Sequence, residues 1–215
     1  MQQQGPIVVL KVGGSLLSLP GLSGRLQAIV REFQDARLLI VCGGGEAADV
    51  VRRWQDVHSL TDEQAHWLAF RAVSLNEALL SHLLPGAVIV PSRDEMRRAW
   101  SAGRLPILAV EAFTRTEEPQ ASLRLPHDWT VTSDSLAVWV AVQLGEQRVV
   151  LGKSCDLVPE ISHREAAARG LVDAHFPVCA AGLTIHWINL RAAEPRLNAW
   201  PDAQEPRQAE PASLV

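Results

Sequence analysis

Two lysines, Lys11 and Lys153, are the side chains whose type and position first suggest chemistry. The other 18 of the 20 basic residues are arginines, and each lysine lies next to or near glycine at the end of an apolar β-branched run. A lysine in an apolar strand is costly to bury unless its ammonium group meets an anion. Its compact charge suits a phosphate group. The pair therefore favours phosphoryl transfer.

Lys11 begins the segment Lys11-Val12-Gly13-Gly14-Ser15. Glycines at a strand end let backbone N–H groups approach a phosphate without interference from a Cβ atom. Ser15 adds a hydroxyl donor, and the expected following helix presents its N-terminus to the same anion. The alternative is an edge lysine that reaches solvent before an ordinary turn. The segment is neither a GxGxxG motif nor a P-loop.

Three consecutive glycines, Gly43, Gly44 and Gly45, follow a second apolar run. A tight turn needs one or two glycines, and three are conformationally costly, so we expect a ligand to lie against this backbone. A flexible connection is the alternative. Arg52, one to two turns into the next helix, can meet an acceptor phosphate there, although a solvated helix face also accounts for it.

Ser133 and Asp134 begin a strongly apolar helix, and either residue is a natural N-cap. The functional interpretation is that Asp134 accepts hydrogen bonds from two active-site lysines and keeps them charged and oriented. That interpretation requires Lys153, which stands in the segment Gly152-Lys153-Ser154-Cys155-Asp156. Both accounts of Asp134 remain open from the sequence.

Alternating apolar runs predict an α/β protein with a mostly parallel, doubly covered sheet. The chain is expected to form one domain over 1–190, with lobes at about 1–130 and 131–190, and a flexible tail over 191–215. Residues 111–128 are expected to form a loop. The predicted strands are 7–12, 37–42, 87–90, 105–110, 148–151 and 183–188. The predicted helices are 22–33, 46–54, 60–84, 94–102, 133–144 and 162–169.

Composition limits the class of protein. A net charge of −4 and the lack of a basic stripe argue against nucleic-acid binding. The longest apolar stretch, Leu136–Leu144, is too short to span a bilayer, and the N-terminus does not have the pattern of an export signal. Cys42, Cys155 and Cys179 lack metal-ligand spacing and are expected to be reduced, buried thiols. We therefore expect a cytoplasmic protein without a metal site of its own or a membrane partner.

In this order, the segments resemble those of the amino-acid kinase superfamily, which includes acetylglutamate kinase, aspartokinase and bacterial uridylate kinase. Lys11–Ser15 resembles its first phosphate loop, Gly43–Gly45 its acceptor loop, and Ser133-Asp134 its lysine-organising aspartate. Lys153 and Asp156 resemble the segment that leads into the nucleotide site. The resemblance implies a three-layer sandwich, ATP and Mg²⁺, a small anionic substrate and a homo-oligomer.

Within the superfamily, Gly43–Arg52, Ala65–Leu68 and Trp129–Ala137 resemble the small kinases of methanofuran biosynthesis. These phosphorylate an aminomethylfuran-methyl phosphate to its diphosphate. One departure concerns the C-terminal half, because residues 158–168 lack the lysine of the family's later glycine-rich turn.

Three functions follow from these observations. The first is an ATP-dependent kinase in which Lys11, Lys153 and Asp134 act on the transferred phosphoryl group. The second is a catalytically degenerate protein that retains the anion sites in a regulatory or assembly role. The third, a NAD-dependent oxidoreductase, is disfavoured because the first loop lacks GxGxxG.

Overall fold

A seven-stranded sheet forms the centre of the computed structural model, which describes residues 5–202. The strand order is β3-β4-β2-β1-β5-β6-β7, parallel throughout except for the antiparallel pair β6 and β7. The strands are β1 (Ile7–Val12), β2 (Arg37–Cys42), β3 (Ala87–Val90), β4 (Leu105–Leu108), β5 (Arg148–Lys153), β6 (Thr184–Asn189) and β7 (Leu197–Trp200).

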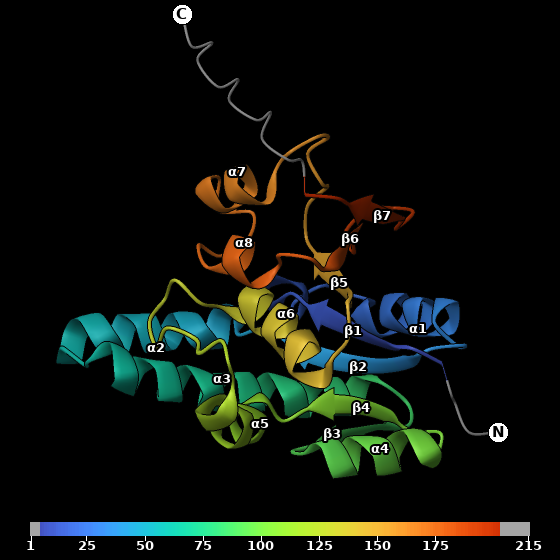
Figure 1. Ribbon diagram of the computed structural model, residues 1–215, viewed down its shortest axis with the longest axis horizontal. Helices are drawn as coiled ribbons and strands as arrows, with labels where there is room; N and C mark the ends of the chain where they lie inside the picture. Colours follow the sequence, from blue (N-terminus) through green and yellow to red (C-terminus); the bar gives the residue numbers. More distant parts are fainter. Residues whose placement is uncertain (1–4, 203–215) are drawn as a thin grey trace, which may run out of the picture.

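Helices cover both faces of the sheet and give the predicted three-layer α/β sandwich (Figure 1). The α-helices are α1 (Leu22–Glu32), α2 (Gly45–His58), α3 (Asp62–Leu83), α4 (Arg93–Ser101), α5 (Val110–Glu117), α6 (Ser133–Leu144), α7 (His163–Ala168) and α8 (Phe176–Cys179). Two 3₁₀ turns, η1 (Gly14–Leu16) and η2 (Glu118–Gln120), complete the elements. No described helix is long and apolar enough to cross a membrane.

The central strand β1 explains why the site lies where it does. All six of its residues are buried, as expected for a parallel strand covered on both faces. β1 lies between β2 and β5, so the carboxyl ends of these three strands meet at one edge of the sheet. Both glycine segments and Lys153 therefore reach the same edge, where ligands bind in open α/β sheets.

Strand register then places the two lysines on one face. Lys11 is the partner of Leu151 across β1 and β5, so these two side chains point to the same side of the sheet. Lys153 lies two residues beyond Leu151 and projects to that side as well. Helix α6 packs over β1 and β5, and its first turn carries Asp134.

Most predicted elements were found, with several corrections. The long helix predicted over 60–84 is α3, and Thr61 forms a capping box with Gln64 at its start. The loop predicted over 111–128 is wrong in its first part, because α5 and η2 occupy it. Buried Val110 and Phe113 hold α5 in place although its other residues are mostly polar.

The flexible tail predicted over 191–215 is also wrong in its first part. β7 pairs with β6, and Trp200 is buried against Phe176 and Trp187. Figure 1 shows β7 next to β6, at the same end of the molecule as α7 and α8. The rest of the predicted tail, 203–215, lies outside the described residues.

Candidate active site

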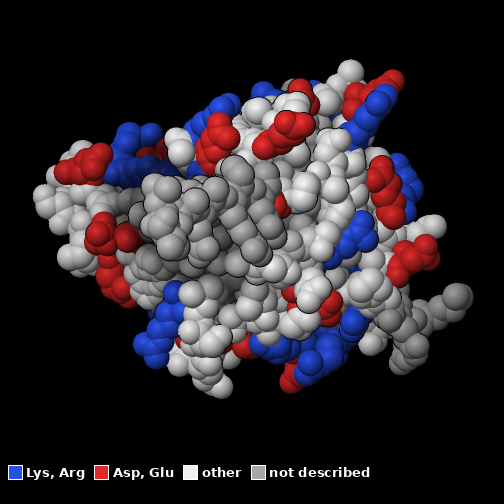
Figure 2. Space-filling view, turned by 45° about the horizontal axis from the view of Figure 1, so that its top comes forward, with Lys and Arg blue, Asp and Glu red and all other residues white. Residues whose placement is uncertain are grey.

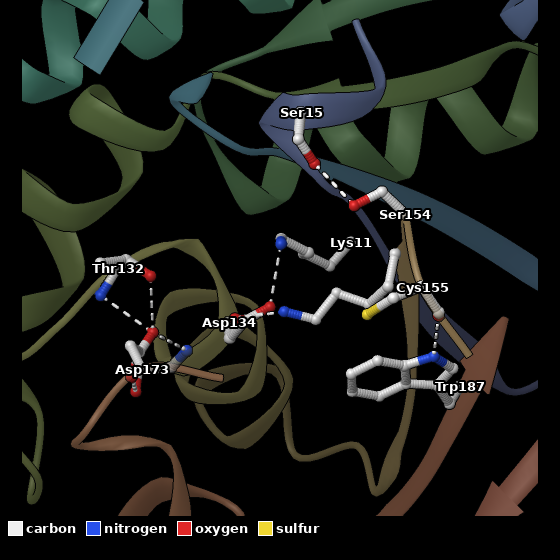
Figure 3. A network of polar contacts seen from close by, with 10 residues as sticks. Lys11, Ser15, Thr132, Asp134, Ser154, Cys155, Asp173 and Trp187 are labelled. Atoms are coloured by element: carbon white, nitrogen blue, oxygen red, sulfur yellow. Dashed lines mark hydrogen bonds and ion pairs between the residues drawn. The ribbon is translucent and has the colours of Figure 1, made fainter. Parts of the chain in front are cut away.

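Lys11, Lys153 and Asp134 meet at the carboxyl edge of the sheet, as the sequence predicts. Lys153 Nζ donates a hydrogen bond to Asp134 Oδ2 at 2.7 Å. Lys11 Nζ lies 2.9 Å from Asp134 Oδ1 as an ion pair without hydrogen-bond alignment. Figure 3 shows Lys11 pointing toward the Asp134 carboxylate, so that ammonium groups from β1 and β5 converge on one carboxylate. The cluster is buried, since Lys11 and Asp134 are each only 4% exposed.

The charges of this cluster depend on one another. Burial alone would raise the pKa of Asp134, but the two nearby ammonium groups outweigh it and lower that pKa to about 2. Burial lowers the pKa of Lys153, and the neighbouring charge of Lys11 lowers it further, while Asp134 opposes both effects. Two cations share one anion, so the cluster has a net positive charge suited to a further anion.

Asp173 fixes the first turn of α6, a role that the sequence interpretation missed. Its carboxylate accepts hydrogen bonds from the backbone N–H groups of Thr132 and Ser135, at 2.9 and 3.0 Å, and from both hydroxyl groups. The predicted caps, Ser133 and Asp134, do not have this role, and the N-cap is Thr132. The N-terminal amides of α6 are thus capped by a remote side chain, which leaves Asp134 free for the lysines.

The two glycine loops touch each other. A Cβ atom on Gly14 would lie 2.0 Å from the backbone nitrogen of Gly45, and one on Gly43 would lie 2.6 Å from that of Gly14. Gly45 also has a positive φ of 48°. Close loop packing is therefore sufficient to require these glycines, in addition to any approach of a ligand.

A cavity of about 190 Å³ lies beside the loops and between α2 and α3. Gly14, Gly44 and Gly45 line one part of it, and Ser133 lies on its wall. Arg52 also lines it, paired with Asp49 at 2.6 Å and placed with its guanidinium carbon 4.2 Å from the centre of the Trp129 ring. Further lining residues, which the sequence interpretation did not assign to a site, are Asp62, His66, Phe70 and Asp128.

The other side of the lysine cluster is more exposed. Ser15 Oγ donates to Ser154 Oγ at 3.2 Å, which links the first loop to the end of β5. Arg191 donates to the backbone oxygen of Ser15 at 2.9 Å. Asp156 accepts a hydrogen bond from Asn189 at 2.9 Å, whereas both lysines pair with Asp134. Polar side chains from the first loop, β5 and the segment after β6 therefore gather on this side of the lysine cluster.

The predicted site residues thus fall into three groups. Lys11, Lys153 and Asp134 form the charged cluster. The cavity is lined by Gly14, Gly44, Gly45, Ser133 and Arg52. The third group does not line the cavity. In this group, the N–H of Gly13 donates to the carbonyl of Gly152, and the N–H of Gly43 donates to the carbonyl of Val12. The other two members, Ser15 and Asp156, lie on the exposed side of the cluster.

No group of three His, Cys, Asp or Glu side chains within residues 5–202 is arranged to hold a metal ion. On the face drawn in Figure 2, basic and acidic residues are interspersed, and no continuous basic stripe is visible.

Comparison with known proteins agrees with the fold. A sequence model described as the Amino acid kinase family matches residues 6–170. The [5-(aminomethyl)furan-3-yl]methyl phosphate kinase of Methanocaldococcus jannaschii is 24% identical over 152 residues, which cover 69% of this chain and 66% of that protein, just under two thirds of its length.

Solved structures share the fold. Uridylate kinase from Archaeoglobus fulgidus superposes with a TM-score of 0.58 and 17% identity, over 84% of this chain and 89% of that one. Aspartate kinase from Synechocystis gives a TM-score of 0.62 and 18% identity, over 90% of this chain and 40% of the longer enzyme. At these identities the likeness concerns the fold.

Proposed function

Because the chain belongs to the amino acid kinase family, we propose that it transfers the γ-phosphoryl group of ATP–Mg²⁺ to a small anionic acceptor. The observation that carries this proposal is the convergence of Lys11 and Lys153 on buried Asp134, next to a glycine-lined cavity. Transfer of this kind depends on positioning and charge stabilisation, and it needs no covalent enzyme intermediate.

In the proposed reaction, the acceptor lies in the cavity and the nucleotide enters from the exposed side, near Ser15, Ser154 and Arg191. An acceptor oxygen attacks the γ-phosphorus, the bond to the bridging oxygen of ADP breaks, and ADP leaves. Lys11 and Lys153 neutralise charge on the transferred group, and Asp134 keeps both side chains oriented.

A phosphate or carboxylate acceptor suits this site better than an alcohol. Such an acceptor arrives ionised and needs no general base. Asp134 is a weak base, since the two lysines lower its pKa to about 2. Arg52 lies in the cavity wall, where its guanidinium can pair with the acceptor anion.

An aminomethylfuran phosphate is the specific acceptor that we propose. The curated relative is named for such a substrate. The cavity walls supply the rings of Phe70, Trp129 and His66 for a flat furan, and burial lowers the pKa of His66 to about 4, which keeps its ring neutral. Asp62 and Asp128, also in the lining, supply carboxylates for an ammonium group. This substrate would place the protein in methanofuran-type one-carbon metabolism.

The test is a phosphoryl-transfer assay with ATP–Mg²⁺ and a panel of furan phosphates, acyl-amino acids and nucleoside monophosphates. We expect transfer to the aminomethylfuran phosphate, a loss of at least a hundredfold in Lys11→Ala, and no change in Arg98→Ala, a substitution on the exposed side of α4. Transfer only to another class of acceptor would refute the proposal of an aminomethylfuran phosphate. Transfer to none of these acceptors would refute the proposal of a kinase.

A degenerate anion-binding protein is the second candidate. It is favoured by the C-terminal half, where α7 and α8 have only six and four residues. Calorimetry separates the two: binding of the acceptor phosphate without binding of ATP–Mg²⁺ would support the degenerate protein.

The predicted homo-oligomer is supported by exposed Trp54 and Leu75 on α2 and α3, and size-exclusion chromatography tests it.

A further inference from the structure

Asn76 is a buried polar side chain in the middle of α3, opposite the three-glycine loop. It is only 6% exposed. Its Nδ2 atom donates to the carbonyl oxygens of both Gly43 and Gly44, each at 2.8 Å. One side-chain amide therefore holds two successive peptide groups of a loop that has no side chains of its own.

These two hydrogen bonds fix the direction of the backbone donors. In a trans peptide, the C=O and N–H groups point in opposite directions. With the carbonyls of Gly43 and Gly44 turned toward Asn76, the N–H groups of Gly44 and Gly45 point away from it. Both glycines line the cavity, whereas Asn76 does not.

The same N–H groups are free to bind a ligand. Within residues 5–202, no hydrogen bond uses the N–H of Gly44 or Gly45 as its donor. They belong to the N-terminal end of α2, where the helix dipole adds positive potential. Two unpaired donors with this orientation form an anion site of the backbone type.

We propose that Asn76 is a positioning residue that sets the acceptor loop to bind a phosphate monoester. The proposal rests on the proposed function and deepens it, because it assigns the acceptor phosphate to the N–H groups of Gly44 and Gly45. Glycine peptides rotate easily. The Gly44 carbonyl is also held by the N–H of Ala48, at 3.2 Å, as the first hydrogen bond of α2. Without Asn76, the Gly43 peptide can therefore turn its carbonyl into the cavity, where the oxygen repels an anion.

The chemistry of the asparagine side chain matches this task. Its NH₂ group has two hydrogens and can serve two carbonyls at once. Aspartate has the same shape but only acceptor oxygens, and leucine has similar volume without any polar atom. Ser74, on the same helix, donates to the α3 carbonyl of Phe70 at 3.1 Å and does not contact the loop, so Ser74→Ala is a matched control.

The test measures binding of benzyl phosphate by calorimetry without nucleotide, binding of ATP–Mg²⁺ separately, and thermal melting. We expect the dissociation constant for benzyl phosphate to rise at least tenfold in Asn76→Asp and Asn76→Leu, and to stay within twofold in Ser74→Ala. Binding of ATP–Mg²⁺ should stay within twofold in all three variants.

Several results would overturn the proposal. One is wild-type affinity for benzyl phosphate in both Asn76 variants, and another is no binding of benzyl phosphate by the wild-type protein. A third is an equal loss of acceptor and nucleotide binding that follows a lower melting temperature, which would show a structural role alone.

Failure of the proposed function gives a different result. Asn76-dependent binding of benzyl phosphate without any phosphoryl transfer would refute the kinase and leave this inference standing. Phosphoryl transfer at the wild-type rate in both Asn76 variants would support the kinase and refute the positioning role of Asn76.

Discussion

The two sides of the Lys11–Asp134–Lys153 cluster are built differently. On the side of α2 and α3, a cavity with glycine, arginine and aromatic walls is already formed. On the side of β5 and β6, half-buried Ser154 and exposed Asp156 are each held by a hydrogen bond to a single side chain. In the proposed reaction, the acceptor side is thus preorganised, and the nucleotide side depends more on contacts that the nucleotide itself forms.

This difference means that the structure defines the ligand more closely on the side of α2 and α3 than on the side of β5 and β6. A preformed cavity limits the size, charge and shape of its ligand. Short helices such as α7 and α8 limit the size, charge and shape of a ligand far less. Substitutions on the two sides should therefore have separable effects on acceptor and nucleotide binding.

The largest effect is expected at Asp134, which serves both sides. Asp134→Asn leaves two buried ammonium groups without their counter-charge, so we expect about 3–5 kcal/mol lower stability and at least a hundredfold lower kcat. Denaturant unfolding and steady-state kinetics measure the two effects. Wild-type stability and turnover together would contradict the role of Asp134.

Asp173 tests whether the C-terminal half positions the cluster. Asp173→Ala removes the cap from Thr132 and Ser135 and leaves buried N–H groups unpaired, which should cost about 1–3 kcal/mol. We expect kcat to fall about tenfold through misplacement of Asp134, with little change in acceptor binding. Asp173→Asn, which retains one acceptor oxygen, should recover part of both losses.

A drop in acceptor affinity alone, with normal kcat, would contradict this assignment of Asp173 to the cluster. It would instead place Asp173 functionally with the acceptor side.

Substitution of Arg52 tests the side of the cluster on which the acceptor is proposed to bind. Arg52→Ala removes a charge-assisted hydrogen bond to the acceptor, so we expect the acceptor KM to rise about tenfold while the KM for ATP is unchanged. Arg53→Ala, on the adjacent exposed position, is the control. Equal changes in both KM values would show that the two sides are not separable.

The smallest effect concerns His127, which connects the segment before Trp129 to α3. Its ring lies 2.5 Å from Glu63 and 3.0 Å from Glu118. Partial burial lowers the pKa of His127, but the two carboxylates outweigh burial and raise it overall. The stabilisation is therefore complete below the unfolded pKa of 6.5 and is lost as pH rises through the higher folded pKa.

We expect His127→Gln to destabilise the protein by under about 1 kcal/mol at pH 5.5, and by less at pH 8.5. Melting curves at the two pH values measure this difference. A larger loss at pH 8.5 would contradict the charge-based account.

Sequence patterns predicted the charged cluster well because it depends on strand ends. Lys11 and Lys153 end adjacent parallel strands, and register alone then places them on one face. Asp173 could not be predicted in this way. It lies 41 positions from Thr132 in an irregular segment, and only the folded chain brings the two together.

The same difference between local and long-range determinants is seen in the fold. Periodicity located α3 and its cap at Thr61, because the signal is local. β7 was missed because it is a short strand in a segment rich in proline and charge. Its place depends on Trp200, which packs on Phe176 and donates to the carbonyl of Ile161. Tertiary packing of this kind leaves little trace in local sequence.

The most direct test of the proposed chemistry is the single-turnover rate of phosphoryl transfer from ATP–Mg²⁺ in Lys11→Ala, Lys153→Ala and the double variant. Each single variant should lose about 10²–10³ in rate with its fold retained. The double variant should lose less than the product of these two factors, because both ammonium groups act on one transferred group. A rate within threefold of wild type in either single variant would contradict the account.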